Sequence, residues 1–330
     1  MSGSALILKD IGKNFYLEKT DIETTPPESG EIVVKVQAVG LNPVDAKLAV
    51  GGHPAWKYPF VPGLDGAGVV VETGSAVSHV KTGDLVTWHG NLLKGGALAE
   101  YATIPAHIVS VVPSGISATV AASIPCAGLT AWNALQVRMH LAKGMTILIE
   151  AGAGGVGGFA IQIAKLMGLH VITTASPANH DYVQSLGADH VINYKHPQIE
   201  QEILAANNGE KLDAVLDSIG GPVASRDLNL LKHEGQYASL LGLPQADPGD
   251  VFTVSPTVYL ISLGSAHLAQ SYAAQCRLAK MGDGLLGELA KGTITPLPIK
   301  EIPFTDTAVT TALHHQLEGH VTGKQVVVFS

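Results

Sequence analysis

The chain of 330 residues contains only two cysteines, Cys126 and Cys276. Two cysteines are too few for a disulfide framework or for a zinc site built from cysteine. Charged residues make up 15% of the chain, the net charge is −8, and no long run of either sign occurs. This charge pattern argues against a nucleic-acid-binding surface.

The chain also lacks long hydrophobic runs. No stretch of about 18 uncharged apolar residues is present, so we expect no membrane span. The first ten residues lack the basic region and small-residue cleavage site of a signal peptide. Hydrophobic residues nevertheless make up 46% of the chain, and the mean hydropathy is +0.26, which is too apolar for disorder. We therefore expect a soluble cytoplasmic protein with room for two domains.

The most informative stretch is glycine-rich and follows an apolar run at 146–150. Gly152, Gly154 and Gly157 fit the pattern G-x-G-x-x-G, with Gly155 and Val156 between them, and a helical pattern follows at 157–167. In dinucleotide-binding domains the three glycines allow the tight turn, the approach of the pyrophosphate and close helix packing. The strand–turn–helix setting favours a nucleotide site over a glycine-rich packing turn.

Three zones differ in pattern along the chain. Residues 1–122 carry β-type runs separated by turn residues, at 31–36, 68–72 and 107–112. Residues 123–264 alternate helical segments with short apolar strands, which we expect at 146–150, 170–174, 190–193, 214–216, 237–241 and 258–263. Residues 265–330 show a helical pattern at 268–289 and end in a strand at 325–329.

These patterns predict an α/β protein with two domains. The alternating zone indicates a doubly wound parallel sheet of the Rossmann type at 123–264. The β-rich zone predicts a partly barrel-like domain at 1–122 and 265–330, because the last strand is expected to return to it. The nucleotide-binding domain is then an insertion.

The cofactor expected at the turn is NADPH. An NAD site carries an acidic residue at the end of the second strand, where this chain reads Thr174-Ala175-Ser176. Without that carboxylate nothing repels a 2′-phosphate, and Ser176, Asn179 and Tyr194 are candidate hydrogen-bond donors to it. No Arg or Lys lies between 172 and 194. Ser176 and Asn179 also suit helix capping, which is compatible with the cofactor role.

Ordered motifs on both sides of the turn resemble the medium-chain dehydrogenase/reductase superfamily, in its zinc-free quinone oxidoreductase-like branch. The resemblance is carried by the segments at 40–45, 61–70, 81–86, 96–101, 124–132, 216–221 and 323–324. It implies a GroES-like catalytic domain and reduction of quinones or activated double bonds with NADPH by a homodimer. We expect the apolar run at 258–263 to pair across the twofold axis.

The resemblance also implies that no metal is bound. Zinc-dependent relatives have Cys where this chain has Asn42, and His where it has Leu64. Only Cys126 matches a cysteine of their catalytic site, and one thiolate cannot replace three zinc ligands. We expect Cys126 to be a small buried residue rather than a redox or catalytic thiol.

Candidate catalytic residues lie in the segment Asn42-Pro43-Val44-Asp45-Ala46-Lys47. Hydride addition to a conjugated carbonyl places negative charge on its oxygen, which a donor would stabilise, and water can supply the proton. By resemblance Asn42 and Asp45 belong to the cleft, and Lys47 resembles chloroplast-type enone reductases. The alternatives are an N-cap for Asn42, a first-turn acid for Asp45 and a solvated lysine for Lys47.

Further candidates surround the cleft motifs. Aromatic residues at 56, 58, 60 and 88 suit a flat substrate but equally suit a core or dimer contact, and His89 is a candidate proton donor. On the cofactor side, family positions or strand ends indicate Thr130, Ser218, Leu241, Gly242 and Lys324.

The sequence thus predicts a zinc-independent, NADPH-dependent reductase of quinones or α,β-unsaturated carbonyls. Two alternatives remain open. One is an enoyl-thioester reductase, and the other is a non-catalytic NADPH-binding sensor or partner-binding protein, which fold alone does not exclude.

Overall fold

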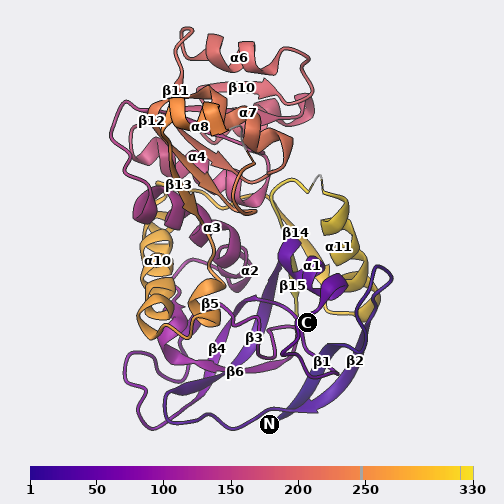
Figure 1. The fold of residues 1–330 in the computed structure, drawn as a ribbon. Helices are drawn as coiled ribbons and strands as arrows, with labels where there is room; N and C mark the ends of the chain where they lie inside the picture. The colour runs from indigo at the N-terminus through magenta and orange to yellow at the C-terminus, as the bar shows by residue number, and fades with distance from the viewer. Residues whose placement is uncertain (246–247, 320, 330) are drawn as a thin grey trace. The chain divides into compact units, whose positions relative to one another are not determined.

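A computed structural model describes residues 1–245, 248–319 and 321–329. The chain divides into two units (Figure 1). Unit 1 comprises Met1–Leu129 and Leu263–Ser330, and unit 2 comprises Thr130–Ser262. Unit 2 holds a parallel sheet and unit 1 is rich in antiparallel strands, which confirms the predicted fold class.

The first boundary lies later in the chain than the predicted one at 122. Helix α3 (Pro125–Trp132) crosses it. The backbone N–H of Cys126 donates to Asp65 of unit 1 over 2.8 Å. That bond ties the start of α3 to the β-rich unit, and apolar periodicity alone does not report such a contact.

The sheet of unit 2 has six parallel strands in the order β10-β9-β8-β11-β12-β13. Their bounds are β8 Thr146–Ile149, β9 His170–Ala175, β10 His190–Asn193, β11 Leu212–Asp217, β12 Leu231–Ser239 and β13 Thr257–Leu260. The order reverses between β8 and β11. In such sheets a ligand binds at this switch point, beyond the carboxyl ends of the strands.

Helices connect the strands of unit 2 and flank its sheet in Figure 1. Their bounds are α4 Gly155–Leu166, α5 His180–Ser185, α6 Ile199–Ala206, α7 Pro222–Leu230 and α8 Pro248–Val254. The central strand β8 is short and apolar because helices cover the sheet, so its residues are buried on both faces. Ile147, Leu148 and Ile149 of β8 all have 0% exposure.

Unit 1 is built on a seven-stranded sheet in the order β14-β15-β3-β4-β5-β7, with β6 also paired to β3. Its strands are β3 Glu31–Leu41, β4 Asp65–Thr73, β5 Leu85–His89, β6 Tyr101–Pro105, β7 Val109–Val111, β14 Ile299–Pro303 and β15 Lys324–Val328. A separate hairpin pairs β1 (Ser2–Leu8) with β2 (Leu17–Glu23). The predicted return of the terminal strand is confirmed, because β15 pairs antiparallel with β3.

The helices of unit 1 lie between these strands in the sequence. They are α1 Pro43–Gly51, α2 Ala118–Ala122, α9 Ser265–Leu268, α10 Tyr272–Lys291 and α11 Asp306–Glu318. The prediction of a single helix at 268–289 was wrong at its start, where the structure has the end of α9 and a break before α10. Gln270 adopts φ +50° and interrupts it, and α10 restarts where Ser271 Oγ accepts from Ala274 N.

Several predicted strands also differ in extent. The strand expected at 258–263 is β13, which ends at Leu260, and the strand expected at 31–36 continues to Leu41. The strand expected at 107–112 is replaced at its start by a 3₁₀ turn, η1 Ala106–Ile108, so only Val109–Val111 is extended. The strand expected at 237–241 begins earlier, at Leu231. Most of its first residues are polar, so a search for short apolar runs did not include them in the strand.

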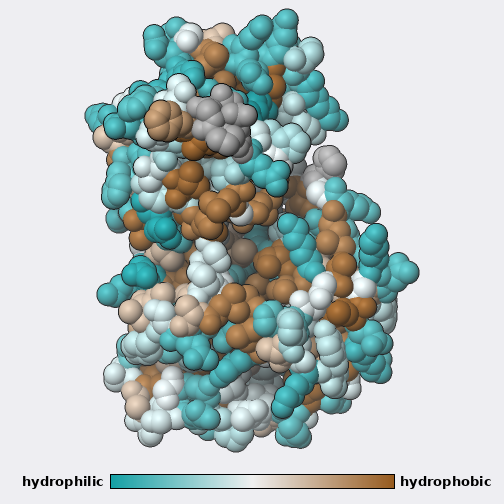
Figure 2. Space-filling view, in the orientation of Figure 1, coloured by the Kyte–Doolittle hydropathy of each residue, from teal (hydrophilic) through white to brown (hydrophobic). Residues whose placement is uncertain are grey.

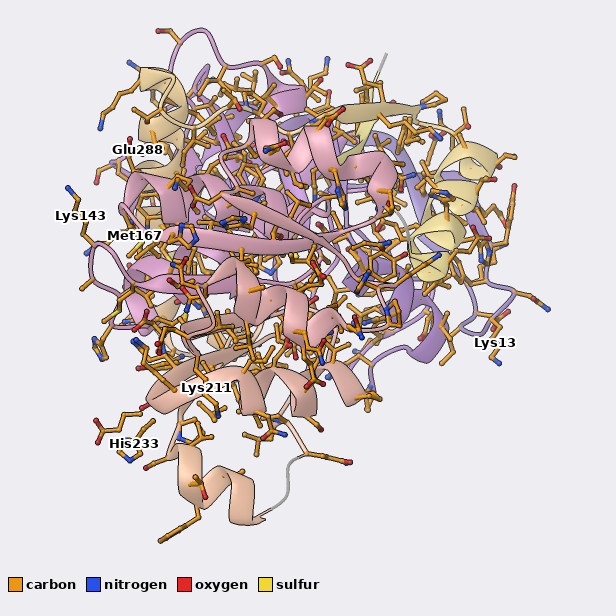
Figure 3. The ribbon with its side chains drawn as sticks, turned by 90° about the horizontal axis from the view of Figure 1, so that it is seen from above. Lys13, Lys143, Met167, Lys211, His233 and Glu288 are labelled. Carbon is orange, nitrogen blue, oxygen red and sulfur yellow. The ribbon has the colours of Figure 1, made fainter. Side chains whose placement is uncertain are left out.

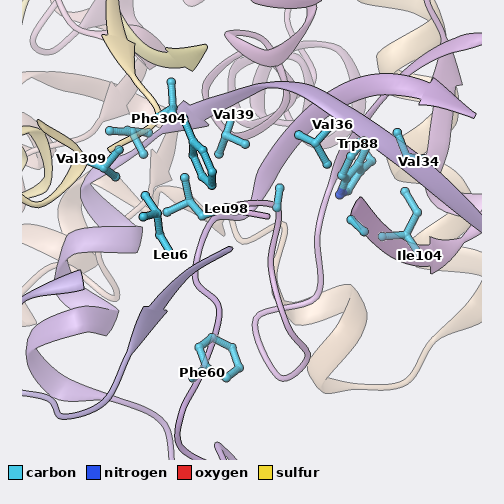
Figure 4. Close-up of a cluster of buried hydrophobic side chains, with 14 of the residues drawn as sticks. Leu6, Val34, Val36, Val39, Phe60, Trp88, Leu98, Ile104, Phe304 and Val309 are labelled. Atoms are coloured by element: carbon cyan, nitrogen blue, oxygen red, sulfur yellow. The ribbon is translucent and has the colours of Figure 1, made fainter. Parts of the chain in front are cut away.

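A large apolar cluster forms the core of the β-rich part of unit 1 (Figure 4). Trp88 of β5 is 3% exposed and lies in this cluster beside Val34 and Val36 of β3. Gly66 of β4 makes room for it, because a Cβ there would lie 2.2 Å from the indole. Since Gly66 pairs with Trp88, this packing fixes the register of β4 and β5 directly before the polar residues described below.

On the surface, hydrophilic and hydrophobic residues are intermixed over the face drawn in Figure 2. Within the described residues, no helix combines the length and apolar character that crossing a membrane requires.

Candidate active site

Three neighbouring strands of unit 1 bring polar residues to one edge of the sheet. Asp65 opens β4 and pairs with His89, the last residue of β5. On its other side Asp65 pairs with Gly40 near the end of β3, two residues before Asn42. The antiparallel register therefore places Asn42, Asp65 and His89 together although they are far apart in sequence.

Asp65 is the centre of this group and has 0% exposure. Its Oδ1 lies 2.9 Å from Nδ1 of His89. Its Oδ2 accepts from the Asn42 side-chain amide over 2.9 Å and from the Cys126 backbone N–H over 2.8 Å. A buried carboxylate must be paired in this way to remain charged, so Asp65 organises the site. Sequence reasoning did not single it out as a site residue.

Asn42 precedes α1 and has the extended backbone of an N-cap, with Pro43 following it in the first turn, which confirms the capping interpretation. The Asp45 side chain accepts from the Asn42 backbone N–H over 2.9 Å through Oδ2. Its Oδ1 accepts from Leu64 N over 3.0 Å. Capping by Asp45 leaves the Asn42 amide to bind Asp65, so Asn42 both begins α1 and joins the network of Asp65.

Lys324 completes the network from the start of β15. It is 4% exposed, and its Nζ donates to Asn42 Oδ1 and, over 3.4 Å, to the carbonyl oxygen of Leu41. The sequence predicted a cofactor contact for this residue, whereas the structure places its ammonium against Asn42 inside unit 1. A buried ammonium needs such acceptors.

Asp45 has an unusual protonation equilibrium. Burial, and secondly the negative charge of Asp65, raise its pKa to about 7. Hydrogen bonds from Asn42 and Leu64 and the positive charge of Lys324 act in the opposite direction. Asp45 therefore titrates near neutral pH inside a network that is otherwise fixed.

Lys47 lies in a different environment from Asn42 and Asp45, the two other candidate catalytic residues. It is exposed on α1, and no hydrogen bond or ion pair to it occurs among the described residues. The interpretation as a solvated helix-face lysine describes its position within unit 1.

The predicted aromatic platform is mostly packed on itself. Trp56 and Phe60 stack with ring centroids 3.8 Å apart at 11°, and Trp56 Nε1 donates to the Leu92 carbonyl over 2.6 Å. Both are buried, and Trp88 belongs to the core. Tyr58, 42% exposed, is the accessible ring of the group. With Asp45, these stacked rings line a small recess of unit 1.

One group of residues has the donor atoms of a metal site. One side-chain donor each from Asp65, His89 and Cys126 lie within 4.8 Å of one another. The arrangement does not fit a zinc ion, because both carboxylate oxygens of Asp65 already accept hydrogen bonds from this network. Burial and the charge of Asp65 also raise the pKa of the Cys126 thiol well above its ordinary value, and zinc binds the thiolate.

In unit 2 the glycine-rich turn follows β8. A Cβ on Gly152 would lie 2.2 Å from Thr173 Oγ1, and one on Gly157 would lie 2.3 Å from the carbonyl oxygen of Ala151. Helix α4 begins at Gly155 with Gly154 as its N-cap. The turn thus needs glycine for close packing and places a helix N-terminus beyond the carboxyl end of β8, which fits a dinucleotide phosphate.

Side chains from β9 and β10 meet near this turn. Ala175 pairs with Asn193 at the strand ends, so Ser176 and Tyr194 follow at the same edge. Asn179 Nδ2 donates to Ser176 Oγ over 3.2 Å. The Lys195 ammonium lies 5.6 Å from the centre of the exposed Tyr194 ring. The sequence has no Arg or Lys between 172 and 194, and Lys195 is the residue directly after that interval.

A charged cluster that the sequence did not predict lies beside the same strand ends. Arg226 of α7 binds Glu150 and, over 2.6 Å, Asp227. Glu150 also accepts from Thr174 Oγ1 over 2.5 Å. Burial raises the pKa of Glu150, and it raises that of Asp227 well above its ordinary value. No local signal in the sequence pairs positions 150 and 226.

The other predicted cofactor residues are distributed over unit 2. Ser218 Oγ donates to the Glu150 carbonyl over 3.2 Å, at the carboxyl ends of β8 and β11. Leu241 is 53% exposed, and Gly242 has φ +116°, both just after β12. Thr130 is buried at 8% exposure in α3.

A separate hollow of about 470 Å³ lies at the other ends of the strands of the same sheet. Lys211 and His233, which line it, are both labelled in Figure 3. Thr146, the first residue of β8, also lines it. The hollow is therefore at the amino ends of the strands, away from the glycine turn.

Comparison with known proteins agrees with this arrangement. Residues 28–114 match the family described as "Alcohol dehydrogenase GroES-like domain", and residues 155–275 match "Zinc-binding dehydrogenase". The chain is 32% identical to a mitochondrial NAD(P)H oxidoreductase, RTN4IP1, of Danio rerio, over 98% of this chain and 90% of that protein. The chain belongs to the medium-chain dehydrogenase/reductase superfamily, in its quinone oxidoreductase-like branch.

Other relatives of this superfamily are similar over different lengths. The chloroplast envelope quinone oxidoreductase homolog of Arabidopsis thaliana is 40% identical over 62% of this chain, and the match spans 64% of that relative. The quinone oxidoreductase structure of Pseudomonas syringae pv. Tomato DC3000 has a TM-score of 0.87 and 28% identity, and the CurK enoyl reductase structure has 0.87 and 27%. Both structural matches cover 99% of each chain. The chain thus spans somewhat less than two thirds of the length of this plant relative and nearly all of the two solved structures.

Proposed function

We propose that this chain is an oxidoreductase that uses NADPH, binds no zinc, and reduces quinones or α,β-unsaturated carbonyls. The observation that carries the proposal is the network of Lys324, Asn42, Asp65 and His89, in which hydrogen bonds already occupy both carboxylate oxygens of Asp65. Reduction without a metal requires an acceptor that is already electrophilic, and a conjugated carbonyl or a quinone is one.

The preference for NADPH rests on the end of β9. Ser176 stands where an NAD site has a carboxylate, and Tyr194 and Lys195 follow the neighbouring strand. A lysine at this edge supplies the positive charge that a 2′-phosphate needs. Lys195→Ala is expected to raise the Kd for NADPH and to leave that for NADH unchanged. Lys143→Ala, an exposed lysine of unit 2 before β8 (Figure 3), is the control.

The roles of the chain's residues follow from their positions. The turn at Gly152, Gly154 and Gly157 holds the pyrophosphate, and the bound nicotinamide supplies the hydride. Asn42 and Asp45 fix the amino end of α1, and Lys324 holds the Asn42 amide in place. Lys47, exposed on the same helix, stabilises the negative charge that develops on the substrate oxygen.

Lys47 is tested by its effect on turnover. Lys47→Ala is expected to lower kcat with an enone and to leave the Kd for NADPH unchanged, because the ammonium acts on the substrate oxygen. Lys13→Ala, another exposed lysine of unit 1 (Figure 3), is the control. An unchanged kcat for Lys47→Ala would show that this lysine is a solvated surface residue without a role in turnover.

The function as a whole is tested by following NADPH and NADH oxidation with quinones, enones and enoyl thioesters, together with metal analysis of the purified protein. Turnover of a quinone or enone with NADPH and without stoichiometric metal supports the proposal. Stoichiometric zinc or a preference for NADH contradicts it. NADPH binding without turnover of any acceptor indicates the sensor instead.

An enoyl-thioester reductase is the second candidate, and the similarity to the CurK enoyl reductase structure favours it. The chemistry at the reacting double bond is the same, but the thioester carries a pantetheine arm. A kcat/KM at least tenfold higher for an enoyl thioester than for the matching enone would identify this activity, since one tenfold step corresponds to about 1.4 kcal/mol of binding to the arm.

We also propose a homodimer formed through β13. This strand ends the sheet of unit 2, and Leu260 on it is 45% exposed. An edge strand with apolar side chains pairs readily with a second copy. Light scattering after size-exclusion chromatography is expected to give twice the chain mass, and Leu260→Lys is expected to give the mass of one chain.

A further inference from the structure

We propose that His89, oriented by Asp65, donates the proton that follows hydride transfer, and that it delivers this proton to the α-carbon of an enone. The inference rests on the proposed reduction of conjugated carbonyls and goes beyond it, because that function requires only water as the proton source. The two residues would act as a buried carboxylate–imidazole pair.

The geometry of the pair defines which ring atom is available. Nδ1 of His89 is 2.9 Å from Asp65 Oδ1, and the two side chains are 4% and 0% exposed. Because Oδ1 accepts this bond, Nδ1 carries a proton and the ring orientation is fixed. Within the described residues, Nε2 has no hydrogen-bond partner. It is also not one of the side-chain atoms that are fully buried without a partner, so it keeps some exposure. It is the ring nitrogen left for a substrate.

The groups around His89 hold its ring and its backbone in place. Asp65 cannot move toward another cation, since Asn42 and the Cys126 backbone hold its second oxygen. The nearby His267 is 3% exposed, and burial lowers its pKa to about 4. A hydrogen bond also joins His267 to the main chain of His89. His267 is therefore neutral near pH 7 and holds the His89 backbone in place, whereas Asp65 holds the imidazole ring through Nδ1.

The step is balanced in atoms and charge. Hydride from NADPH forms a C–H bond at the β-carbon, and the electron pair of the double bond moves to give an enolate. The N–H bond at Nε2 then breaks as a C–H bond forms at the α-carbon, leaving the saturated ketone, NADP⁺ and neutral His89. Solvent returns the proton to His89. Protonation of carbon is slow without a positioned donor, whereas the oxygen of a hydroquinone anion takes its proton from water.

The test compares His89→Gln with the wild-type protein on an α-methyl enone and on a benzoquinone. His89→Gln is expected to lower kcat for the enone about 10²-fold and that for the quinone by less than about threefold. In addition, the wild-type protein is expected to give mainly one configuration at the new α-carbon. The variant is expected to give both in similar amounts, because water protonates either face.

His107→Gln is the matched control. His107 is a partly buried histidine of unit 1 whose Nε2 lies 2.8 Å from Gln275 Oε1, and a glutamine can keep that bond. Its kinetics and product configuration are expected to equal those of the wild type.

Each other result overturns the proposal. Equal losses with enone and quinone would make His89 a structural residue. An unchanged enone kcat, or a retained product configuration in His89→Gln, would show that His89 donates no proton to carbon. If the wild-type protein itself reduces no enone or quinone, the proposed function fails, and that outcome is recognised before any variant is measured.

Discussion

The side-chain amide of Asn42 donates a 2.9 Å hydrogen bond to Oδ2 of Asp65, a residue 23 positions away in the sequence. The same amide group accepts from Lys324, 282 positions away. Asn42 therefore links the ends of three strands, β3, β4 and β15. A residue that first presents itself as a helix cap is the junction of the site.

Replacing Asn42 is expected to destabilise unit 1. Asn42→Ala removes an acceptor from the buried Lys324 ammonium and a donor from Asp65. Losses of this kind cost roughly 1–3 kcal/mol of unfolding free energy, measured by urea denaturation. Lys47→Ala on the same helix, where the side chain is exposed, is expected to stay within about 0.5 kcal/mol. Equal effects of the two variants would contradict the network.

Asp45 is expected to make stability depend on pH near neutrality. Its pKa is about 7 in the folded protein against 3.8 unfolded, so the folded state retains a proton that the unfolded state loses. The resulting stability is complete below pH 4 and is lost as the pH rises through 7. Relative to Asp45→Asn, the wild type should lose up to about 1.4 kcal/mol per pH unit within this window.

Denaturant midpoints of both proteins at several pH values between 5 and 8.5 measure this difference. A difference that stays constant over the whole range would show that Asp45 is ionised throughout.

Arg226 is expected to contribute strongly to the stability of unit 2. Arg226→Met leaves Glu150 and Asp227 buried without their cation, and breaking such a cluster costs about 3–5 kcal/mol. The loss should be smaller at pH 5 than at pH 8, because burial raises the pKa of both acids and protonation removes their charge.

The control for this cluster is Lys232→Met, whose partner is Asp213. The Lys232 side chain is 50% exposed, and exposed pairs contribute at most about 1 kcal/mol. Thermal unfolding of both variants at the two pH values makes the comparison. A loss for Arg226→Met that is equal at pH 5 and pH 8 would argue against repulsion between charged acids.

Gly157→Ala is expected to abolish tight NADPH binding. Its Cβ would lie 2.3 Å from the Ala151 carbonyl oxygen and 2.7 Å from the Gly152 Cα, so the turn would have to open. We expect the Kd for NADPH, followed by fluorescence titration, to rise at least about tenfold, or 1.4 kcal/mol. Gly287→Ala in α10 meets no atom within 4 Å and should leave NADPH binding unchanged. An equally tight Gly157→Ala would refute the role of the turn.

Local signals predicted much of the fold. Gly152, Gly154 and Gly157 located the strand–turn–helix of unit 2, and Asn42 with Pro43 located the start of α1. These predictions were correct because each depends on a few neighbouring residues, whose backbone geometry is decided locally.

The rest of the site depends on contacts between distant segments. Asp65 and His89 meet through the register of β4 and β5, which the packing of Trp88 on Gly66 fixes. Arg226 reaches Glu150 only after α7 has packed on the parallel sheet. No periodicity or motif in a single sequence reports such pairs, so the sequence indicated the polar residues near Asn42 but not their partners.

The position of Lys324 has a consequence for synthesis. The ribosome completes unit 2, at Thr130–Ser262, before it makes the second segment of unit 1, and β15 is made after the other strands. A nascent chain can therefore fold its dinucleotide turn while Asn42 still lacks its ammonium partner. A chain terminated before Lys324 would contain all of unit 2 but would lack the ammonium that donates to Asn42 Oδ1 in unit 1.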